Sequence, residues 1–399
     1  MPELYPRSLT VSAGITGSSE SAPSSSNDTS SLLADLNHEQ AILQLPITAF
    51  LTLLMSFGVT GNACVIYVYR TRFRKTSGSY FIMILAILDL LNSGLCIPWE
   101  IYVLSNSYLQ DHPVLCRVAR FVATFVYISA GLILVCVAFS RLVVLYFKIV
   151  KPLHCYSSGQ AQSLTVVVAA IALCLVWPQL ALSGTRTVET RIPGLYGHDC
   201  SISDQMQRSI YPILFHGCLY GVFTLCFALL TGFYMRIVWV VWRRGGNRLG
   251  EQVAHRDYTP RSSASNASDR SFGSSQNVSV ASRSQAGHHH RTSVLARVGR
   301  TTRMLGLVTF VFLLGYVPFL TVHVIYLLGM GFQRPMDYSQ QLLYQLCLRS
   351  YFLSSAANPL IYSILNVRFR KESMVALKSV ILRLPKWIRR RIKGEHEVT

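Results

Sequence analysis

The sequence predicts an all-α membrane protein, a bundle of seven transmembrane helices with a short amphipathic cytoplasmic helix after the seventh span. Of its 399 residues, 51% are hydrophobic and only 14% are charged, and the mean hydropathy is +0.36. This is too apolar for one soluble domain. Long apolar runs, each near the roughly 20 residues that cross a bilayer, alternate with short basic or polar segments. We therefore expect a multi-pass protein embedded in a lipid bilayer.

The net charge of +19 is distributed beside the apolar runs. A protein that binds nucleic acid would gather its cations in one groove or in an RNA-reading motif, whereas the cations here flank the predicted spans. Cytoplasmic loops of membrane proteins carry this excess of Lys and Arg. Membrane topology therefore explains the charge, and no nucleic-acid partner is expected.

Residues 1–42 precede the first span. They are rich in serine and lack an apolar core, so we expect a disordered extracellular tail without a cleavable signal peptide. Asn27 begins an Asn-Asp-Thr sequence, which is a glycosylation acceptor if the tail is extracellular. The first span covers residues 45–69, and residues 70–75 add four cations directly after it. This bias places the N-terminus outside the plasma membrane.

Four more spans precede a long polar segment. They are predicted at residues 80–104, from Cys116 to beyond Arg141, at 163–182 and at 209–242. Asp89 lies in the middle of the second span, where an ionisable residue is costly and usually functional, and faces the bundle interior with a partner. Residues 244–295, rich in Ser, Arg, Asn and Gly, predict a disordered third cytoplasmic loop with phosphorylation sites.

The last two spans carry internal prolines. Residues 294–328 contain Pro318, and residues 340–365 contain Asn358 followed by Pro359. Proline removes a backbone hydrogen bond and frees a carbonyl one turn earlier, which lipid cannot satisfy. Other parts of the chain must therefore supply partners for these groups.

The segment after the seventh span is basic and aromatic. Residues 367–382 place apolar side chains at helical spacing, which predicts an amphipathic helix at the membrane interface. An odd number of spans puts the C-terminus in the cytoplasm, and the cations after the last span agree. The membrane domain then covers residues 43–383, and residues 384–399 form a basic cytoplasmic tail.

Four motifs occur along the spans at fixed spacing, namely Asn62, Leu85-Ala-x-x-Asp89, Phe312-x-x-x-Tyr316-x-Pro318 and Asn358-Pro359-x-x-Tyr362. Each motif alone is weak, whereas all of them in this order are a strong signal. Over residues 45–381 the chain resembles a rhodopsin-like (class A) G-protein-coupled receptor of the peptide-receptor type. The resemblance implies a signalling protein and not an enzyme.

The resemblance implies an activation network made of Asn62, Asp89, Ser354, Asn358, Pro359 and Tyr362. Asn62, Asp89 and Asn358 are each costly alone in hydrocarbon, but facing one another they can share hydrogen bonds and water. In the family this cluster holds a sodium ion, so a structural sodium at Asp89 is the one metal expected. Ala130 stands where the family usually has a serine ligand.

The resemblance also implies a moving sixth helix. Tyr316 takes the place of the rotamer switch at the floor of the ligand site, where tryptophan is more usual, and Phe312 packs below it. Pro318 kinks the helix, so that its two halves can swing relative to each other.

The G-protein-coupling site departs from the family pattern. Arg141 lies 25 residues after Cys116, as the family's arginine should, but Ser140 replaces the acid that usually precedes it. Because the resting state then lacks a charge partner for Arg141, we expect higher basal activity than is typical. Arg141, Tyr234 and Tyr362 would line the groove that admits a helix of the heterotrimeric G protein.

Cys116 and Cys200 fall at predicted extracellular positions and can pair. In the family such a disulfide joins the third helix to the second extracellular loop. Residues 185–200 alternate polar and apolar side chains, which suggests a hairpin able to contact an extended peptide.

An extracellular neuropeptide is the ligand we expect. Ala123 stands where amine receptors carry an aspartate, and Phe352 where opsins carry a lysine, so an amine is disfavoured and retinal is excluded. The candidate ligand-binding residues at the rim are Glu100, Ala123, Arg191, His323 and Arg349. A receptor for a small acid or lipid, an ion-coupled transporter or channel, and a receptor that does not signal remain as alternatives.

Overall fold

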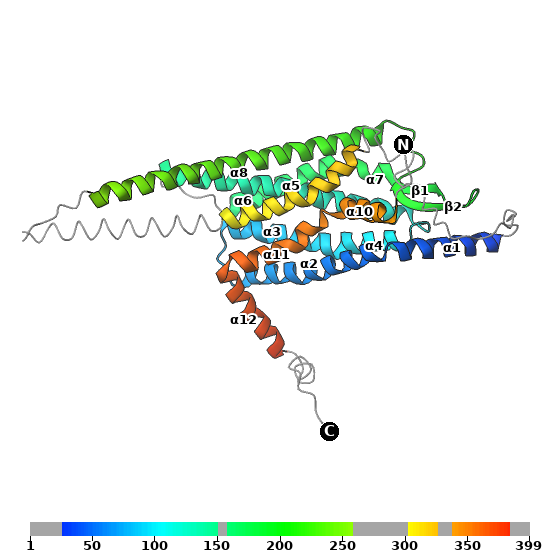
Figure 1. The fold of residues 1–399 in the computed structure, drawn as a ribbon, viewed down its shortest axis with the longest axis horizontal. Coiled ribbons are helices and arrows are strands. Elements are labelled where there is room, and N and C mark those ends of the chain that lie inside the picture. The colour runs from blue at the N-terminus through cyan, green and yellow to red at the C-terminus, as the bar shows by residue number, and fades with distance from the viewer. Residues whose placement is uncertain (1–25, 151–157, 258–301, 326–336, 384–399) are drawn as a thin grey trace, which may run out of the picture.

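The computed structural model describes residues 26–150, 158–257, 302–325 and 337–383 (Figure 1). The chain forms a bundle of long helices with one two-stranded hairpin. In chain order the helices before the hairpin are α1 (Ser26–Leu43), α2 (Leu45–Thr71), α3 (Ser77–Leu91), the π-helix η1 (Asn92–Cys96), α4 (Ile97–Ser105), α5 (Pro113–Val150), α6 (Ser158–Val176) and α7 (Pro178–Leu182). The later helices are α8 (Tyr211–Asp257), Thr302–Ile325, α10 (Tyr338–Arg349), α11 (Phe352–Leu365) and α12 (Val367–Arg383).

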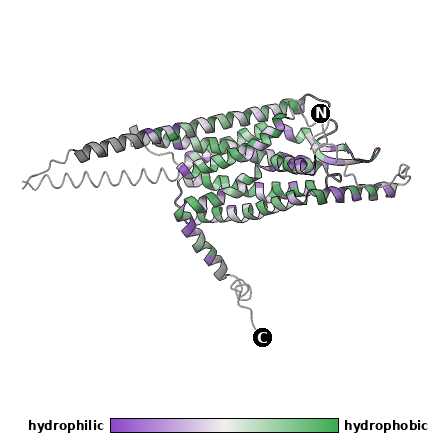
Figure 2. Ribbon diagram, viewed as in Figure 1, coloured by the Kyte–Doolittle hydropathy of each residue, from purple (hydrophilic) through white to green (hydrophobic). Residues whose placement is uncertain are grey.

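Six of these helical segments are long and apolar enough to cross a membrane, and Phe352–Leu365 is a shorter apolar helix. Figure 2 shows hydrophobic residues along the whole length of the bundle helices. Large apolar side chains such as Phe57 and Ile364 are exposed on its surface, whereas Asn62 and Asp89 are buried inside. Apolar residues outside and polar residues inside are the arrangement expected in lipid. The prediction of a seven-helix membrane bundle is confirmed.

Prolines explain where spans are interrupted. The second span runs through α3, η1 and α4, and Pro98 stands at the start of α4. Because proline cannot donate a backbone hydrogen bond, a helix often adopts a π-bulge beside it. The fourth span is also interrupted at a proline, since α6 ends at Val176 and α7 begins at Pro178.

Two glycines of α2 allow close helix contacts. A Cβ atom at Gly58 would overlap the Ser93 side chain of η1, and a Cβ atom at Gly61 would lie 2.7 Å from the ring of Pro359. Small residues at helix interfaces let backbones approach, which is the main source of packing between helices in lipid. The first, second and seventh spans therefore meet around Asn62.

The bundle has two distinct ends. The strands β1 (Ser183–Glu189) and β2 (Tyr196–Ile202) form an antiparallel hairpin at the end that also carries α1, and we call this the hairpin end (Figure 1). At the opposite end, the α12 end, α12 leaves the bundle at a steep angle. This is the direction expected of a helix that lies in the membrane interface.

Two predicted disordered segments are partly helical. Residues 26–42 belong to α1, which is held to the bundle because the Asn37 side chain bonds the backbone of Ser105 and Tyr108. Residues 244–257 extend α8 instead of starting the loop. These two predictions were wrong, because a helix that continues from a membrane span needs no separate nucleation.

The remaining predictions for these segments fall partly outside the described residues. Asn27, the predicted glycosylation site, lies in the first turn of α1. The tail at 1–25, the loop at 258–295 and the basic tail at 384–399 lie outside the part of the chain that the structure describes.

Candidate functional site in the helix bundle

A cluster of buried polar side chains joins the first, second and seventh spans at mid-length. The Asn358 amide donates a 2.7 Å hydrogen bond from Nδ2 to Oδ2 of Asp89. Nδ2 of Asn62 donates to the carbonyl oxygens of Ser355 and Gly58, both at 2.9 Å. All three residues are therefore buried and hydrogen-bonded, Asp89 and Asn358 to each other and Asn62 to backbone carbonyls, which offsets much of the cost of burying them.

A cavity of about 20 Å³ lies beside Asp89 and is also lined by Asn92, Ser354 and Asn358. This is room for about one water molecule or a small ion. Among the described residues, the Oδ1 atoms of Asn92 and Asn358 are buried and have no hydrogen-bond partner. A carboxylate with unpartnered amide oxygens fits a sodium ion, which prefers hard oxygen ligands. Ala130 lines the same cavity with a methyl group and supplies no ligand.

Stacked aromatic rings connect this cluster to the hairpin end. The rings of Phe312 and Tyr316 are 4.5 Å apart between centroids, and both side chains are buried. Tyr316 also lies 4.7 Å from Phe223 of α8 and 5.7 Å from Tyr351. A change in the Tyr316 rotamer would therefore disturb contacts with both the fifth and the seventh spans.

Pro318 lies one half-turn beyond Tyr316 in the helix Thr302–Ile325. Its missing N–H leaves the carbonyl one turn earlier without its usual helical donor, so this point bends more easily than the rest of the helix.

At the α12 end, Arg141 is largely enclosed against α3, and a Cβ atom at Gly78 would overlap its guanidinium. No carboxylate lies within 4.0 Å of Arg141 in the described ranges, and its Nε has no hydrogen-bond partner there. Tyr234 accepts a 3.2 Å hydrogen bond from Thr309, which links the fifth and sixth spans. The Tyr362 hydroxyl is buried and has no partner among the described residues.

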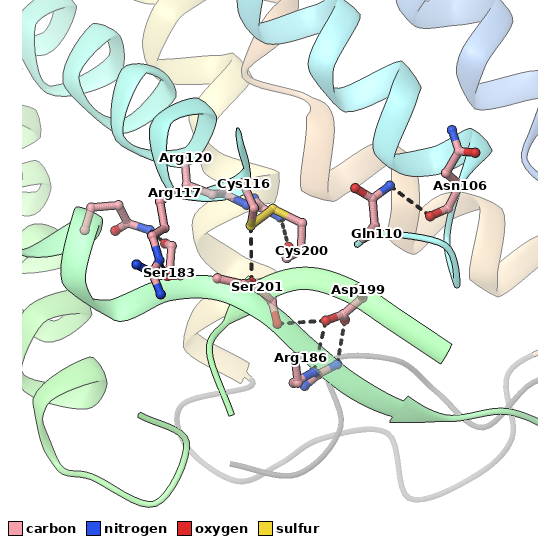
Figure 3. The surroundings of a disulfide bond; sticks show 12 residues. Asn106, Gln110, Cys116, Arg117, Arg120, Ser183, Arg186, Asp199, Cys200 and Ser201 are labelled. Atoms are coloured by element: carbon pink, nitrogen blue, oxygen red, sulfur yellow. Dashed lines mark hydrogen bonds and ion pairs between the residues drawn. A yellow bond between two sulfur atoms is a disulfide. The ribbon is translucent and has the colours of Figure 1, made fainter. Parts of the chain in front are cut away.

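A disulfide and an ion pair hold the hairpin (Figure 3). Cys116 of α5 is bonded to Cys200 of β2, with the two Cα atoms 5.6 Å apart, which confirms this pairing. Arg186 of β1 makes a two-pronged contact with Asp199 of β2, at 2.8 and 3.2 Å. The hairpin is therefore fixed to the third span, and its own strands are fixed to each other.

The predicted ligand-binding residues at this end do not form one rim. Arg349 is buried and pairs at 2.7 Å with Glu100, whose side chain is 14% exposed, and Arg349 also contacts Gln345. Arg191 pairs with Glu39 of α1 at the exposed outer edge. Glu100 and Arg349 therefore balance each other's charge, and their contact with a ligand stays a prediction.

His323 and Ala123 face the interior of the bundle at this end. The His323 ring lies 4.2 Å from Phe319 and 5.7 Å from Tyr220. Ala123 is partly buried against the main hydrophobic core. Neither His323 nor Ala123 is an acid, so neither could pair with an amine.

Four polar residues of the bundle were not predicted from the sequence. Asn92 donates to the Ser355 hydroxyl at 2.8 Å, and the two lie three residues after Asp89 and three before Asn358. A spacing of three residues puts Asn92 on the same helix face as Asp89, and Ser355 on the same face as Asn358. Helical periodicity could therefore have predicted both residues. Arg120 and His216 lie on α5 and α8 near the hairpin. Arg120, one turn after Cys116, could have been found in the same way.

Known proteins resemble the chain over most of its length. The model of the 7 transmembrane receptor (rhodopsin family) matches residues 61–362. A QRFP-like peptide receptor of Branchiostoma floridae is 23% identical over 344 residues, covering 84% of this chain and 78% of that receptor. The Tachykinin-like peptides receptor 86C of Drosophila melanogaster is 25% identical over 213 residues, covering 50% of this chain and 40% of that receptor.

Proposed function

The chain belongs to the rhodopsin family of 7 transmembrane receptors, and we propose that it transmits the binding of an extracellular peptide to a heterotrimeric G protein. The receptor class follows from the family, which is a family of receptors and not of enzymes. The observation that carries the signalling proposal is the buried bond between Asp89 and Asn358, which joins the second and seventh spans beside a small cavity.

The hairpin end is the proposed extracellular end. It carries the disulfide, a bond that forms and persists in oxidising compartments. The opposite end carries the cations of residues 70–75 and the basic α12, as cytoplasmic segments do. The protein would then span the plasma membrane with its N-terminus outside and α12 in the cytoplasm.

A peptide is the proposed ligand. Both relatives described above are named as peptide receptors. The β1–β2 hairpin is held over the third span and offers strand edges with hydrogen-bonding groups to an extended chain. Ala123 provides no acid for an amine. These observations favour a neuropeptide-like ligand over a small amine.

The proposed mechanism is a population shift between two bundle shapes. A ligand that contacts the aromatic rings at Phe319 and Tyr351 would bind one shape better and so increase its population. Movement of the Tyr316 and Phe312 rings would transmit the change of shape toward Asp89. The sixth span would swing at Pro318.

Outward movement of the sixth span would separate Thr309 from Tyr234 and open a groove at the α12 end. Arg141, Tyr234 and Tyr362 would line it and contact a helix of the G protein. The segment 258–295 that precedes the sixth span is the proposed contact region for kinases and arrestin.

The cavity beside Asp89 is the proposed site of a structural sodium ion. Asp89, Ser354 and Asn358 would hold it by oxygen atoms, and the ion would balance the carboxylate charge in the resting shape. A shape that brings the second and seventh spans closer together would remove the space that the ion needs.

The test is Asp89→Asn in cells that report both G-protein activation and ion flux. A receptor with this network loses or alters ligand-driven activation while no flux is seen in either form. Wild-type flux that disappears in Asp89→Asn, in a chain that never engages a G protein, would instead indicate an ion-coupled transporter.

A further inference from the structure

Arg120 is a cation at the hairpin end whose charge is not balanced. It lies on α5 one turn after Cys116, and its Nη2 donates a 2.8 Å hydrogen bond to the Cys200 carbonyl (Figure 3). Its Nε is buried and has no hydrogen-bond partner in the described ranges. The four acid–base pairs of those ranges use other cations, so no carboxylate lies within 4.0 Å of Arg120 there.

Two histidines from other helices lie close to Arg120. The ring of Tyr220 lies between the two imidazoles, 6.5 Å from His216 of α8 and 5.7 Å from His323 of the sixth span between centroids. Arg120 lies near enough for its charge to act on both histidines. The three side chains, which we call the cationic cluster, are all partly buried. Three different spans thus bring hydrogen-bond donors together beneath the hairpin, and no carboxylate of the described residues pairs with any of the three within 4.0 Å.

The backbone fixes which imidazole nitrogen is free. Nδ1 of His216 lies 2.8 Å from the Pro212 carbonyl, and Nδ1 of His323 lies 2.9 Å from the Phe319 carbonyl. Because a carbonyl oxygen only accepts, each Nδ1 carries the proton and donates it. Nε2 is then the nitrogen left for a ligand, and it becomes a donor when the ring is protonated.

The acids that form ion pairs at this end are already engaged with cations other than Arg120. Glu100 is paired with Arg349 at 2.7 Å, and Arg349 is buried. Moving Glu100 toward Arg120 would leave Arg349 buried without its counter-charge, which is strongly unfavourable. The missing negative charge must therefore come from outside the described bundle.

We propose that the cationic cluster of Arg120, His216 and His323 binds a carboxylate of the ligand, with the rings of Tyr220 and Phe319 packing against the adjoining part. Arg forms short, two-pronged hydrogen bonds with carboxylates, and these are strong where water is partly excluded. The proposal rests on the proposed receptor function and names the chemistry that its ligand site selects. The carboxylate could belong to an acidic side chain, a peptide C-terminus or a small organic acid.

The experiment measures binding of small probes to purified full-length receptor in nanodiscs, so it needs no signalling. Three aromatic carboxylates represent the three sources: N-acetyl-Phe-Glu-amide, N-acetyl-Gly-Phe with a free C-terminus, and phenylacetate. Each is paired with its uncharged amide. Probes of this size bind with affinities on the order of millimolar, which thermal stabilisation of the receptor can measure as a function of probe concentration.

At least one carboxylate should stabilise the wild type more than its amide does, and the pair with the largest difference identifies the source. Arg120→Gln should weaken carboxylate binding by on the order of 10- to 100-fold and leave the amides unchanged. Arg120→Lys, which keeps the charge, should retain part of the affinity. Arg117→Gln is the matched control, since Arg117 lies on the same helix and bonds the Ser183 carbonyl of the same hairpin.

Equal binding of every carboxylate and its amide would overturn the proposal, as would equal loss in Arg117→Gln and Arg120→Gln. Preference for benzylammonium over phenylacetate would overturn it too, and would indicate that Glu100 receives a cationic ligand. If Arg120→Gln folds poorly, the proposal is still tested by comparing each carboxylate with its amide in the wild type and in Arg120→Lys. Failure of the receptor function is a separate result, because it would appear as absent G-protein activation with carboxylate binding intact.

Discussion

The two ends of the bundle differ in whether their charged side chains have an oppositely charged partner. All four acid–base pairs of the described residues lie at the hairpin end, from the buried Glu100–Arg349 pair to the exposed Arg191–Glu39 pair. At the α12 end, Arg141 is enclosed and no acid lies within reach in the described ranges.

We infer from this difference that the hairpin end is held in one shape, whereas the α12 end can move. Paired charges and the disulfide at the hairpin end fix the shape that a ligand meets, which favours selective binding. An unpaired buried charge at the α12 end stores an unfavourable interaction that a change of shape or a partner can relieve. The α12 end should therefore be the easier one to displace, and five substitutions test this contrast.

Breaking the buried pair should have the largest effect. Glu100→Gln leaves Arg349 in the bundle without its counter-charge, so the folded state should lose roughly 3–5 kcal/mol. Thermal unfolding of the purified receptor measures this loss. The double variant Glu100→Gln with Arg349→Met should recover much of it, because the orphaned charge is then gone. A single variant as stable as the wild type would show that the pair does not hold this end.

An acid placed next to Arg141 should stabilise the resting shape of the α12 end. Ser140 is buried directly before Arg141, and Ser140→Asp would offer a charge-assisted hydrogen bond worth roughly 1.5–3 kcal/mol to the resting shape. Ligand-free G-protein activation should fall on the order of 10-fold or more as a result.

The missing acid also predicts measurable basal signalling in the wild type. The comparison is ligand-free output of wild type against Arg141→Ala at equal surface expression, and output should drop in the variant. Equal ligand-free signalling in the two proteins would contradict the inference that the missing charge partner of Arg141 raises basal activity.

Removing the orphan hydroxyl at the α12 end should stabilise the resting protein. The Tyr362 ring packs against Tyr69 and Phe369, but its hydroxyl is buried without a partner among the described residues. Tyr362→Phe removes an unsatisfied group, so the resting receptor should gain up to about 1–3 kcal/mol. Ligand-driven activation should fall, since the hydroxyl would gain its partner only in the active shape. A loss of thermal stability would instead mean that the hydroxyl is already satisfied at rest.

The smallest effect is expected at the exposed pair of the hairpin end. Glu39 and Arg191 have side chains that are 57% and 46% exposed, and such surface pairs contribute about 0–1 kcal/mol. Glu39→Gln should therefore leave the unfolding temperature nearly unchanged, and it serves as the matched control for Glu100→Gln. A large loss would mean that α1 is held mainly by this charge.

The course of the chain through the membrane could be predicted because lipid imposes simple requirements on a sequence. Each span needs about 20 apolar residues, so the positions of Asp89, Pro318 and Asn358 within spans followed from counting. Cations beside the spans predicted the two ends in the same way. The hairpin was predicted from the alternating residues before Cys200.

Which polar groups meet was decided by the tertiary structure. Asn62 bonds the Ser355 carbonyl, 293 positions away, and does not bond Asp89; Glu100 pairs with Arg349 inside the bundle and not at its rim. Such contacts depend on how each helix is rotated and tilted against its neighbours, which close packing at Gly58 and Gly61 controls. The sequence by itself thus determined which residues are buried in the membrane, and only the packed bundle selected their partners, because partner choice depends on distances between helices that no local pattern contains.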